Sequence, residues 1–387
     1  MEFLSTLGTN LSSGLTIAVS FLVALTVVVF VHEFGHFQVA RWCGVAVKTF
    51  SIGFGKELFG WNDKKGTHWR IAAIPLGGFV QFIDDANAAS AGANDKEPVE
   101  LTKEQREGAF HSQPVWKRAA VVSAGPIFNF ILAIVIFAIT FMILGRTIME
   151  AKVADVQPGT PAAAAGFQKG DVITSINGTK IEGFSVLQKI VSSRVGQELT
   201  FGVDRNGSQL VLKATPELRE LDDAIAGKIK RPVIGIKASR EFSKLTHKTV
   251  GPLQAVGLGV SRTWDIASGT LSYLADVVTG RQSAEQIGGI VRIADVAGKV
   301  AAIDWRQLIM FTAFISVSIG LINLFPIPVL DGGHLVFYAI EFLRGRPLSE
   351  QVQEYCFRVG FALILMLMVF GFYNDRGILA RWFTWTS

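Results

Sequence analysis

The chain has 387 residues, of which 50% are hydrophobic and 18% are charged, and its formal net charge is +5. A charge of this size is ordinary for a membrane protein whose loops contact anionic lipid, and no basic stripe with interleaved aromatic residues indicates nucleic-acid binding. The two cysteines, Cys43 and Cys356, lie far apart in the chain, which excludes a disulfide framework.

The hydrophobic residues are concentrated in four runs, at about 15–40, 119–144, 307–328 and 353–373. A helix needs roughly 20 apolar residues to cross a bilayer, and the first three runs reach that length. The fourth run is uninterrupted only from Val359 to Phe372, so we expect it to extend upstream and to tolerate Arg358 by snorkelling. The sequence therefore predicts a polytopic α-helical membrane protein with four transmembrane helices.

The positive charges beside the first run predict the orientation of the chain. No Lys or Arg precedes this run, whereas Arg41, Lys48 and Lys56 follow it, and loops rich in Lys and Arg remain in the cytoplasm. The C-terminal end of the first helix is therefore expected on the cytoplasmic side. Counting spans from this end places residues 146–306 on the opposite side of the membrane.

The segment that follows the first run combines two patterns. The stretches "SIGFGKELFGW" and "THWRIAAIPLGGFVQFI" alternate apolar and polar residues with glycines at the bends, which predicts short strands or hairpins. They are too apolar to lie in water, so we expect them to dip into the cytoplasmic face of the membrane. The polar stretch "DDANAASAGANDKEPVELTKEQREGAF" is expected to be a mobile loop.

A separate soluble domain is expected between the second and third runs. Short β-branched segments alternate there with the turn sequences "NGT" and "RNGS", and apolar residues at helical spacing over 250–279 predict an amphipathic helix. The expected parts, in chain order, are transmembrane helix 1 at 1–40, the cytoplasmic-side β region and loop at 41–118, helix 2 at 119–145, the soluble domain at 151–240, an amphipathic helical region at 241–306, helix 3 at 307–335 and helix 4 at 353–374.

The end of the first apolar run carries a metal-binding motif. His32, Glu33 and His36 form the pattern H-E-x-x-H after a stretch without any charge. Residues four apart share one face of a helix, so the two histidines can bind one metal ion while Glu33 takes a proton from a bound water. Ionisable groups at bilayer depth are costly, which favours a function over a structural role.

A catalytic zinc ion requires a third protein ligand. Topology favours Asp331 as this ligand, because the first and third apolar runs point in the same direction and their C-terminal ends reach the same leaflet. His334 is an alternative ligand, in which case Asp331 would be its hydrogen-bond partner. The acidic and histidine side chains that we considered are Asp84, Asp85, His111, Asp331, His334 and Glu341.

Three further motifs accompany H-E-x-x-H. The stretch "NLFPIPVLDG" at 323–332 matches N-x-x-P-x-P-x-L-D-G, "AGPIFNF" at 124–130 lies in the second run, and "GFG" at 53–55 and "IPLGGFV" at 74–80 lie in the β region. With these motifs in this order, the sequence resembles the site-2 proteases, the zinc intramembrane metalloproteases, of the bacterial type that cleaves anti-sigma factors.

The resemblance implies zinc as the cofactor, His32, His36 and Asp331 as its ligands, and Glu33 as the general base. It implies that Asn323 holds the substrate backbone or the oxyanion, and that Asn129 also contributes to substrate binding. The β region at 41–118 would be a membrane re-entrant element. Its strand edges near 70–82 could pair with an unwound substrate, and for this reason we also assign substrate contacts to Ile71 and Ala73.

The same resemblance implies that 151–240 is an extracytoplasmic PDZ domain, a β-rich α+β fold inserted between two spans. One such domain fits here, whereas the better-known enterobacterial member carries two, and Gly289 stands where relatives often have proline. The domain would either bind the new C-terminus of a clipped substrate or exclude substrates with large external domains. We favour exclusion, because "AAAAGF" at 162–167 contains no Lys or Arg to pair with a carboxylate.

The expected function is the cleavage of single-span membrane proteins, anti-sigma factors or remnant signal peptides, in the bacterial inner membrane. The expected partners are these substrates, the lipid bilayer and an upstream site-1 protease that acts on the same substrate, with no nucleic acid. Two other functions are weighed against it. A non-catalytic PDZ scaffold would not need Glu33, and a divalent-metal transporter predicts carboxylates in several spans and internal repeats, which the sequence lacks.

Overall fold

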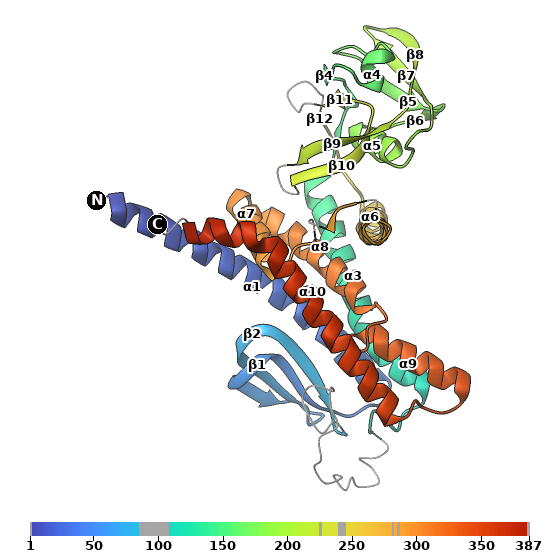
Figure 1. Cartoon of the computed structure of the whole chain (residues 1–387). Helices are drawn as coiled ribbons and strands as arrows, with labels where there is room; N and C mark the ends of the chain where they lie inside the picture. The colour runs from blue at the N-terminus through green and yellow to red at the C-terminus, as the bar shows by residue number, and fades with distance from the viewer. Residues whose placement is uncertain are drawn as a thin grey trace. The chain divides into compact units, whose positions relative to one another are not determined.

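The computed structural model describes residues 2–84, 108–223, 227–238, 245–280, 282–284 and 287–384 (Figure 1). Most of the segment expected as a mobile loop, 85–107, lies outside the described residues. The chain forms two compact units, one made of residues 1–139 and 256–387 and the other of residues 140–255.

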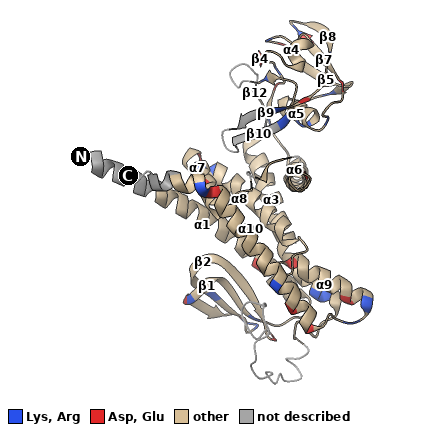
Figure 2. Cartoon of the chain, viewed as in Figure 1, with Lys and Arg blue, Asp and Glu red and all other residues tan. Residues whose placement is uncertain are grey.

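In the part of the chain that the structure describes, four helices are long and apolar enough to cross a membrane: α1 (Glu2–Trp42), α3 (Val115–Leu144), α8 (Trp305–Asn323) and α10 (Glu350–Thr384). Figure 2 shows long stretches of α1 and α3 without charged residues. The fourth helix is longer than its uninterrupted apolar run and includes Arg358, which pairs with Glu354 one turn earlier. The chain is therefore a membrane protein with four candidate spans.

The first unit is organised around α1. This helix contacts α7 (Ile290–Ile303), α8 and the β region. Ala24 and Val28 of α1 form a buried cluster with Ile315 of α8. Small residues allow helix backbones to approach closely in a membrane, where packing rather than the hydrophobic effect holds helices together.

A polar clasp joins α10 to the start of α7. The buried carboxylate of Asp375 accepts hydrogen bonds from the backbone N–H groups of Gly289 and Arg292, at 2.9 and 3.1 Å. The neighbouring Asn374 side chain donates to the carbonyl oxygens of Ala284 and Ile287. The bond from residue 289 requires a backbone N–H, which glycine has and proline lacks.

Two bent strands, β1 (Val47–Asn62) and β2 (His68–Phe82), form the β region. Gly53 and Gly55 have φ of 88° and 86°, in the left-handed region that glycine adopts without strain, and the strands turn there. Residues of β1 therefore have neighbours on two sides: Ser51 lies opposite both Phe79 and Arg70.

The β region is fixed to the end of α1. Arg41, at the last turn of α1, forms an ion pair with Asp63 in the turn between β1 and β2. Trp69 donates its Nε1–H to the same carboxylate at 3.1 Å, and its ring packs against Phe37 of α1 with centroids 5.0 Å apart. The sheet thus follows the position of the helix that carries the H-E-x-x-H motif.

A non-helical segment interrupts the helix between α8 and the short helix α9 (Asp331–Arg344). Pro326 and Pro328 lie in this break and end the helix. A Cβ at Gly332 would lie 2.3 Å from the Phe325 carbonyl oxygen, and one at Gly333 would lie 2.4 Å from the Ile327 carbonyl oxygen. The two glycines therefore allow α9 to fold back onto the break and place Asp331 at its first position.

The second unit has its own core around a four-stranded sheet of order β6-β5-β7-β8. Its fully buried residues include Leu199, Phe201 and Val203 of β7. The helix α6 (Pro252–Val278) follows it in the chain. The elements of the unit are β3 (Arg146–Met149), β4 (Asp155–Val156), α4 (Pro161–Ala164), β5 (Val172–Ile176), β6 (Thr179–Lys180), α5 (Phe184–Ser192), β7 (Leu199–Arg205), β8 (Ser208–Ala214), β9 (Glu217–Asp223), β10 (Gly227–Val233), β11 (Ile236–Lys237) and β12 (Leu245–Lys248).

The second unit extends beyond the domain expected at 151–240. Strand β12 pairs with β3 in antiparallel register, with Lys248 opposite Arg146. In the region expected to be helical from 241, the first described element is therefore a strand. Both strands have only four residues and lie about a hundred residues apart in the chain, so no local pattern reveals the pairing.

A buried ion pair stabilises the second unit. The Asp171 carboxylate is fully buried and accepts hydrogen bonds from Arg205 at 2.7 and 2.8 Å and from the Gln168 backbone N–H at 2.9 Å. Burial raises the pKa of Asp171, but the hydrogen bonds and the charge of Arg205 outweigh this effect and hold the pKa below its ordinary value.

We predict that this pair makes the stability of a 146–248 fragment depend on pH. Because the pKa of Asp171 is lower in the folded state, its contribution is complete above the ordinary Asp pKa and is lost as the pH falls through the depressed value. Asp171→Asn should lower the free energy of unfolding by about 2–3 kcal/mol at pH 7, because it leaves Arg205 partly buried and unpaired.

Urea unfolding at several pH values measures this effect. Lys213→Gln is the control, since it breaks the exposed Lys213–Glu198 pair and should cost less than about 1 kcal/mol. A difference between wild type and Asp171→Asn that stays constant from pH 7 to pH 2 would contradict the prediction.

Candidate metal centre

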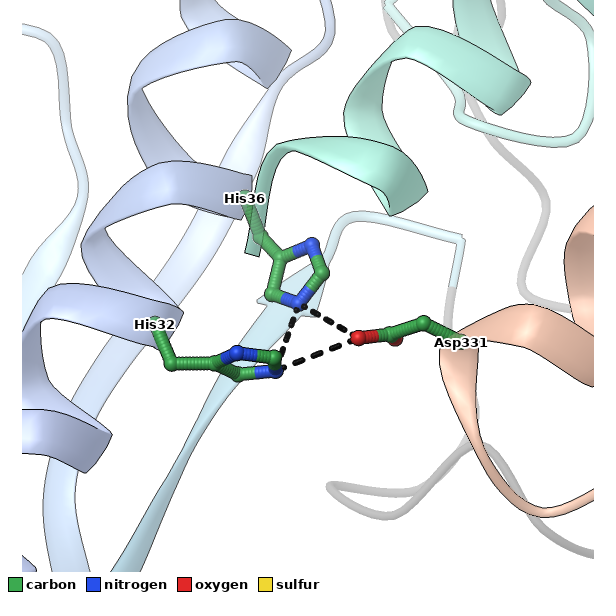
Figure 3. Close-up of side chains that lie close together, drawn as sticks. All are labelled: His32, His36 and Asp331. Carbon is green, nitrogen blue, oxygen red and sulfur yellow. Dashed lines mark hydrogen bonds and ion pairs between the residues drawn. The ribbon is translucent and has the colours of Figure 1, made fainter. Parts of the chain in front are cut away.

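The two histidines of the motif and Asp331 converge on one point (Figure 3). His32 Nε2 and His36 Nε2 are 3.2 Å apart, and Asp331 Oδ2 lies 3.2 Å from the first and 3.6 Å from the second. Both histidines are buried, and Asp331 Oδ2 is a buried atom without a hydrogen-bond partner. Among the described residues, this is the group of His, Cys, Asp and Glu side chains with metal-binding geometry.

The outer nitrogens of the histidines are held by α3. His36 Nδ1 lies 2.9 Å from the Val121 carbonyl oxygen, which can only accept, so Nδ1 carries the proton and Nε2 presents its lone pair to the site. His32 Nδ1 lies against the Asn129 amide, 3.1 Å from its nitrogen. The Asn129 amide oxygen is buried without a partner, and turning the amide by 180° would let it accept the His32 Nδ1 proton in the same way.

The backbone of α3 forms the wall of the site. A Cβ at Gly125 would lie 2.3 Å from His36 Nε2 and 2.7 Å from His32 Cε1, and a Cβ at Gly35 would lie 2.6 Å from the Ala124 carbonyl oxygen. Only glycine fits at either position. Two histidines and a carboxylate are a typical donor set for zinc at a catalytic site, with a fourth position left for water or substrate. The residues present therefore fit a zinc ion.

Glu33 lies beside the ligands and touches the β region. The Val80 backbone N–H is hydrogen-bonded to the Glu33 carboxylate. A Cβ at Gly78 would lie 3.1 Å from Glu33 Cγ, so glycine allows β2 to approach the helix closely. Glu33, His36 and Asp331 line a cavity of about 430 Å³.

Two expected substrate-binding residues have other positions. Asn129 is fully buried and contacts His32, so it orients a ligand rather than lining a surface that a peptide could reach. Ile71 lies between Ile52 on one side and Phe59 on the other, which leaves no open strand edge at this residue. Ala73 is exposed, and it lies two residues after Ile71 in the same segment of β2, which is not the segment beside Glu33. The strand segment that reaches the site is instead that of Gly78 and Val80.

The other sequence candidates differ in how close they lie to the ligand group. Asn323 Nδ2 lies 3.3 Å from His32 Nε2, so this side chain is adjacent to the ligand group. Asp84 accepts hydrogen bonds from the backbone of Phe110 and from His111, which hold its pKa at about 2 although burial raises it. His111, His334 and Glu341 line the cavity outside the ligand group, and Asp85 lies outside the described residues.

Sequence reasoning missed three groups that build the site. The Val121 carbonyl and the Val80 N–H belong to the backbone, and no side-chain pattern marks them. Gly125 lies within the quoted stretch "AGPIFNF", but a single glycine in an apolar helix is equally compatible with ordinary helix packing.

We predict that replacing His32, His36 or Asp331 by Ala lowers bound zinc at least tenfold, because each change removes one of three ligands. Metal analysis of the purified variants measures this loss. His334→Ala is the control and should retain zinc, since its side chain lies outside the ligand group. Zinc retention in Asp331→Ala together with loss in His334→Ala would show that the third ligand is His334.

Gly125→Ala should also lower bound zinc in the same metal analysis. Its Cβ would lie 2.3 Å from His36 Nε2 and displace that ring, although all three ligands remain in the chain.

Comparison with known proteins agrees with this geometry. Residues 20–367 match the model of peptidase family M50. The chain is 47% identical over 357 residues to a Mesorhizobium japonicum protein named as a zinc metalloprotease, covering 92% of this chain and 97% of the relative. It is 41% identical over 382 residues to Metalloprotease MmpA of Caulobacter vibrioides, covering 93% and 95%.

One solved structure, the PDZ domain of an SdrC-like protein from Listeria monocytogenes, is 22% identical, covers 22% of this chain and 82% of its own, and has a TM-score of 0.18. The family assignment does not depend on it. The match to the family model spans most of the chain and includes the H-E-x-x-H motif and Asp331. The chain belongs to peptidase family M50 and is a membrane-spanning zinc metalloprotease.

Proposed function

We propose that the chain hydrolyses peptide bonds within the transmembrane segments of single-span membrane proteins. The observation that supports this proposal most directly is the position of the ligands, which lie near the C-terminal end of the candidate span Gly14–Trp42. Two histidines and a glutamate within an apolar helix are costly unless the chemistry takes place at that depth.

Zinc held by His32, His36 and Asp331 would supply Lewis-acid polarisation of the scissile carbonyl and of a water molecule. Glu33 accepts a proton from the attacking water and delivers it to the leaving amide nitrogen as the carbon–nitrogen bond breaks. The Val80 N–H lies against the Glu33 carboxylate on the side of the β region. Asn323 lies beside His32 and would donate a hydrogen bond to the oxygen of the reacting carbonyl.

The substrate must be unwound before this reaction, because a helical peptide bond is shielded by its own hydrogen bonds. We infer that the segment of Gly78 and Val80 in the re-entrant β element keeps the unwound peptide extended by β-strand addition. This segment pairs with β1 through Val80 and Phe50, and the Val80 N–H also approaches the Glu33 carboxylate, which supports a role for the strand beside the general base. The missing side chain at Gly78 lets this segment lie against Ser51 of β1 and Glu33 of α1, which keeps it close to the general base.

We predict that Glu33→Gln abolishes cleavage, by roughly 10²–10⁴-fold or more, and leaves bound zinc unchanged. Cleavage of a single-span substrate in detergent and metal analysis of the same preparation measure the two quantities. Glu354→Gln, on the exposed side of α10, should change neither. A non-catalytic scaffold would be indifferent to Glu33→Gln, so unchanged cleavage products would refute the proposed chemistry. Substrates trapped by this variant in membranes can be identified by mass spectrometry.

The second proposal concerns location: the chain lies in the bacterial inner membrane with its active site toward the cytoplasm and the 140–255 unit outside. Arg41, Lys48 and Lys56 after the first span support this orientation. Cysteines introduced at Ser208 should react with an impermeant reagent from outside, and those at Ser90 only from inside, after Cys43 and Cys356 are replaced. The reverse labelling pattern would overturn the orientation.

We further propose that the 140–255 unit is a PDZ domain that excludes substrates with large external domains, so that an upstream site-1 protease must trim them first. Arg146 of β3 and Lys248 of β12 lie opposite each other in adjacent antiparallel strands. Residues 147–247 can therefore be removed and the ends joined by a short linker. The deletion should allow cleavage of untrimmed substrates. Slower cleavage of trimmed substrates, without any gain on untrimmed ones, would instead indicate capture of the new C-terminus.

A further inference from the structure

The third ligand belongs to a helix that is not continuous with a transmembrane span. Asp331 is the first residue of α9, and the break at 324–330 separates it from α8. The residue before it, Leu330, provides no side-chain cap to the helix. Packing of α8 therefore does not by itself determine where the Asp331 carboxylate lies, and contacts further along α9 must contribute.

One such contact is a buried ion pair between α9 and α3. Arg118 Nη2 lies 2.6 Å from Glu341 Oε1, and the two side chains are only 11% and 14% exposed. Arg118 Nε also donates to the Gln113 carbonyl oxygen at 3.0 Å, and its guanidinium lies 5.0 Å from the centre of the Tyr338 ring. The arginine is thus held from three directions and can occupy few other positions.

Arg118 belongs to α3, the helix whose residues also contact both histidines of α1. Val121, one turn after Arg118, accepts from His36, and Asn129 contacts His32. Tyr338, one turn before Glu341, is buried in the same cluster as Val121. All three ligands are therefore positioned against α3, the histidines through Val121 and Asn129 and the aspartate through contacts on α9.

Geometry explains why the contact matters at a distance. Glu341 follows Asp331 by ten residues, which is about 15 Å along a helix. A helix that begins at a break in the chain can pivot, and a shift of about 1 Å at a metal ligand is enough to weaken binding. An ion pair with a two-point hold on the arginine restricts this pivoting more than an apolar contact does.

We propose that the Arg118–Glu341 pair positions the third metal ligand, by fixing α9 against α3 so that Asp331 stays within reach of His32 and His36. The inference rests on the assignment of Asp331 as a zinc ligand. Arg118 and Glu341 are positioning residues, because neither touches the ligand group. The pair also lines the cavity that contains Glu33, so its loss would change the lining of that cavity.

The test measures zinc affinity by competition with a chelator on the full-length protein in detergent. Arg118→Gln and Glu341→Gln should each weaken zinc binding roughly 10–100-fold, the range seen when a group that orients a ligand is removed. The charge-exchanged protein Arg118→Glu/Glu341→Arg should recover part of the affinity, because it restores the ion pair but not the bond to the Gln113 carbonyl oxygen. Glu354→Gln/Arg358→Gln is the matched control, because it removes an exposed ion pair on α10 and should change nothing.

Size-exclusion profiles and thermal unfolding identify variants that do not fold. Arg118→Lys and Glu341→Asp, which keep the charges, then replace such variants, with a smaller expected loss of zinc affinity. Wild-type zinc affinity in folded Glu341→Gln would overturn the proposal, and so would failure of the charge exchange to recover affinity. Zinc retention in Asp331→Ala would refute the ligand assignment beneath it. Because the readout is zinc affinity, the result does not depend on which substrate the enzyme cleaves.

Discussion

The metal centre depends on the close approach of α1 and α3 through Gly35 and Gly125. At both positions a single methyl group would overlap atoms of the opposite helix, 2.6 Å from a carbonyl oxygen in one case and 2.3 Å from a ligand nitrogen in the other. This approach brings the Val121 carbonyl within 2.9 Å of His36 and the Asn129 amide within 3.1 Å of His32. Without it, the two rings would keep their spacing on α1 but lose the contacts that set their tautomers and orientations.

Because α3 occupies one side of the histidines, the remaining groups must come from elsewhere. Asp331 reaches the site from α9 after a break that two prolines impose and two glycines make compact. Glu33 is held from the other direction by the Val80 N–H of β2. The β region in turn is attached to α1 by the Arg41–Asp63 pair, so the base and the strand that restrains it move with the same helix.

The sequence was most informative where function requires side chains of a given type at a given spacing. His32 and His36 are four apart because they share a helix face. Asp331 could be chosen because it follows a run that is expected to point in the same direction as the first, although it starts a separate helix. Asn129 was recognised as a site residue, but its contact with a ligand rather than with substrate depends on which face of α3 is turned inward. Apolar residues surround that helix, so periodicity could not decide this.

Features made by backbone atoms or by distant pairing could not be predicted in the same way. Ile71 seemed to lie on an open edge because alternation marks a strand but not its neighbours, and here both sides are occupied. Strands β3 and β12 pair across the whole second unit with four residues each. The Arg118–Glu341 pair joins residues more than two hundred positions apart, and neither residue stands in a recognisable motif.

The clasp between α10 and α7 affects how easily these two helices can separate within the membrane. Asp375 lies within the candidate span Glu350–Ala380, and its charge is tolerable there because two backbone N–H groups and Arg292 surround it. Separating α10 from α7 at this level would expose that carboxylate and both donors to hydrocarbon. Lateral opening between these two helices is therefore costly at the level of Asp375.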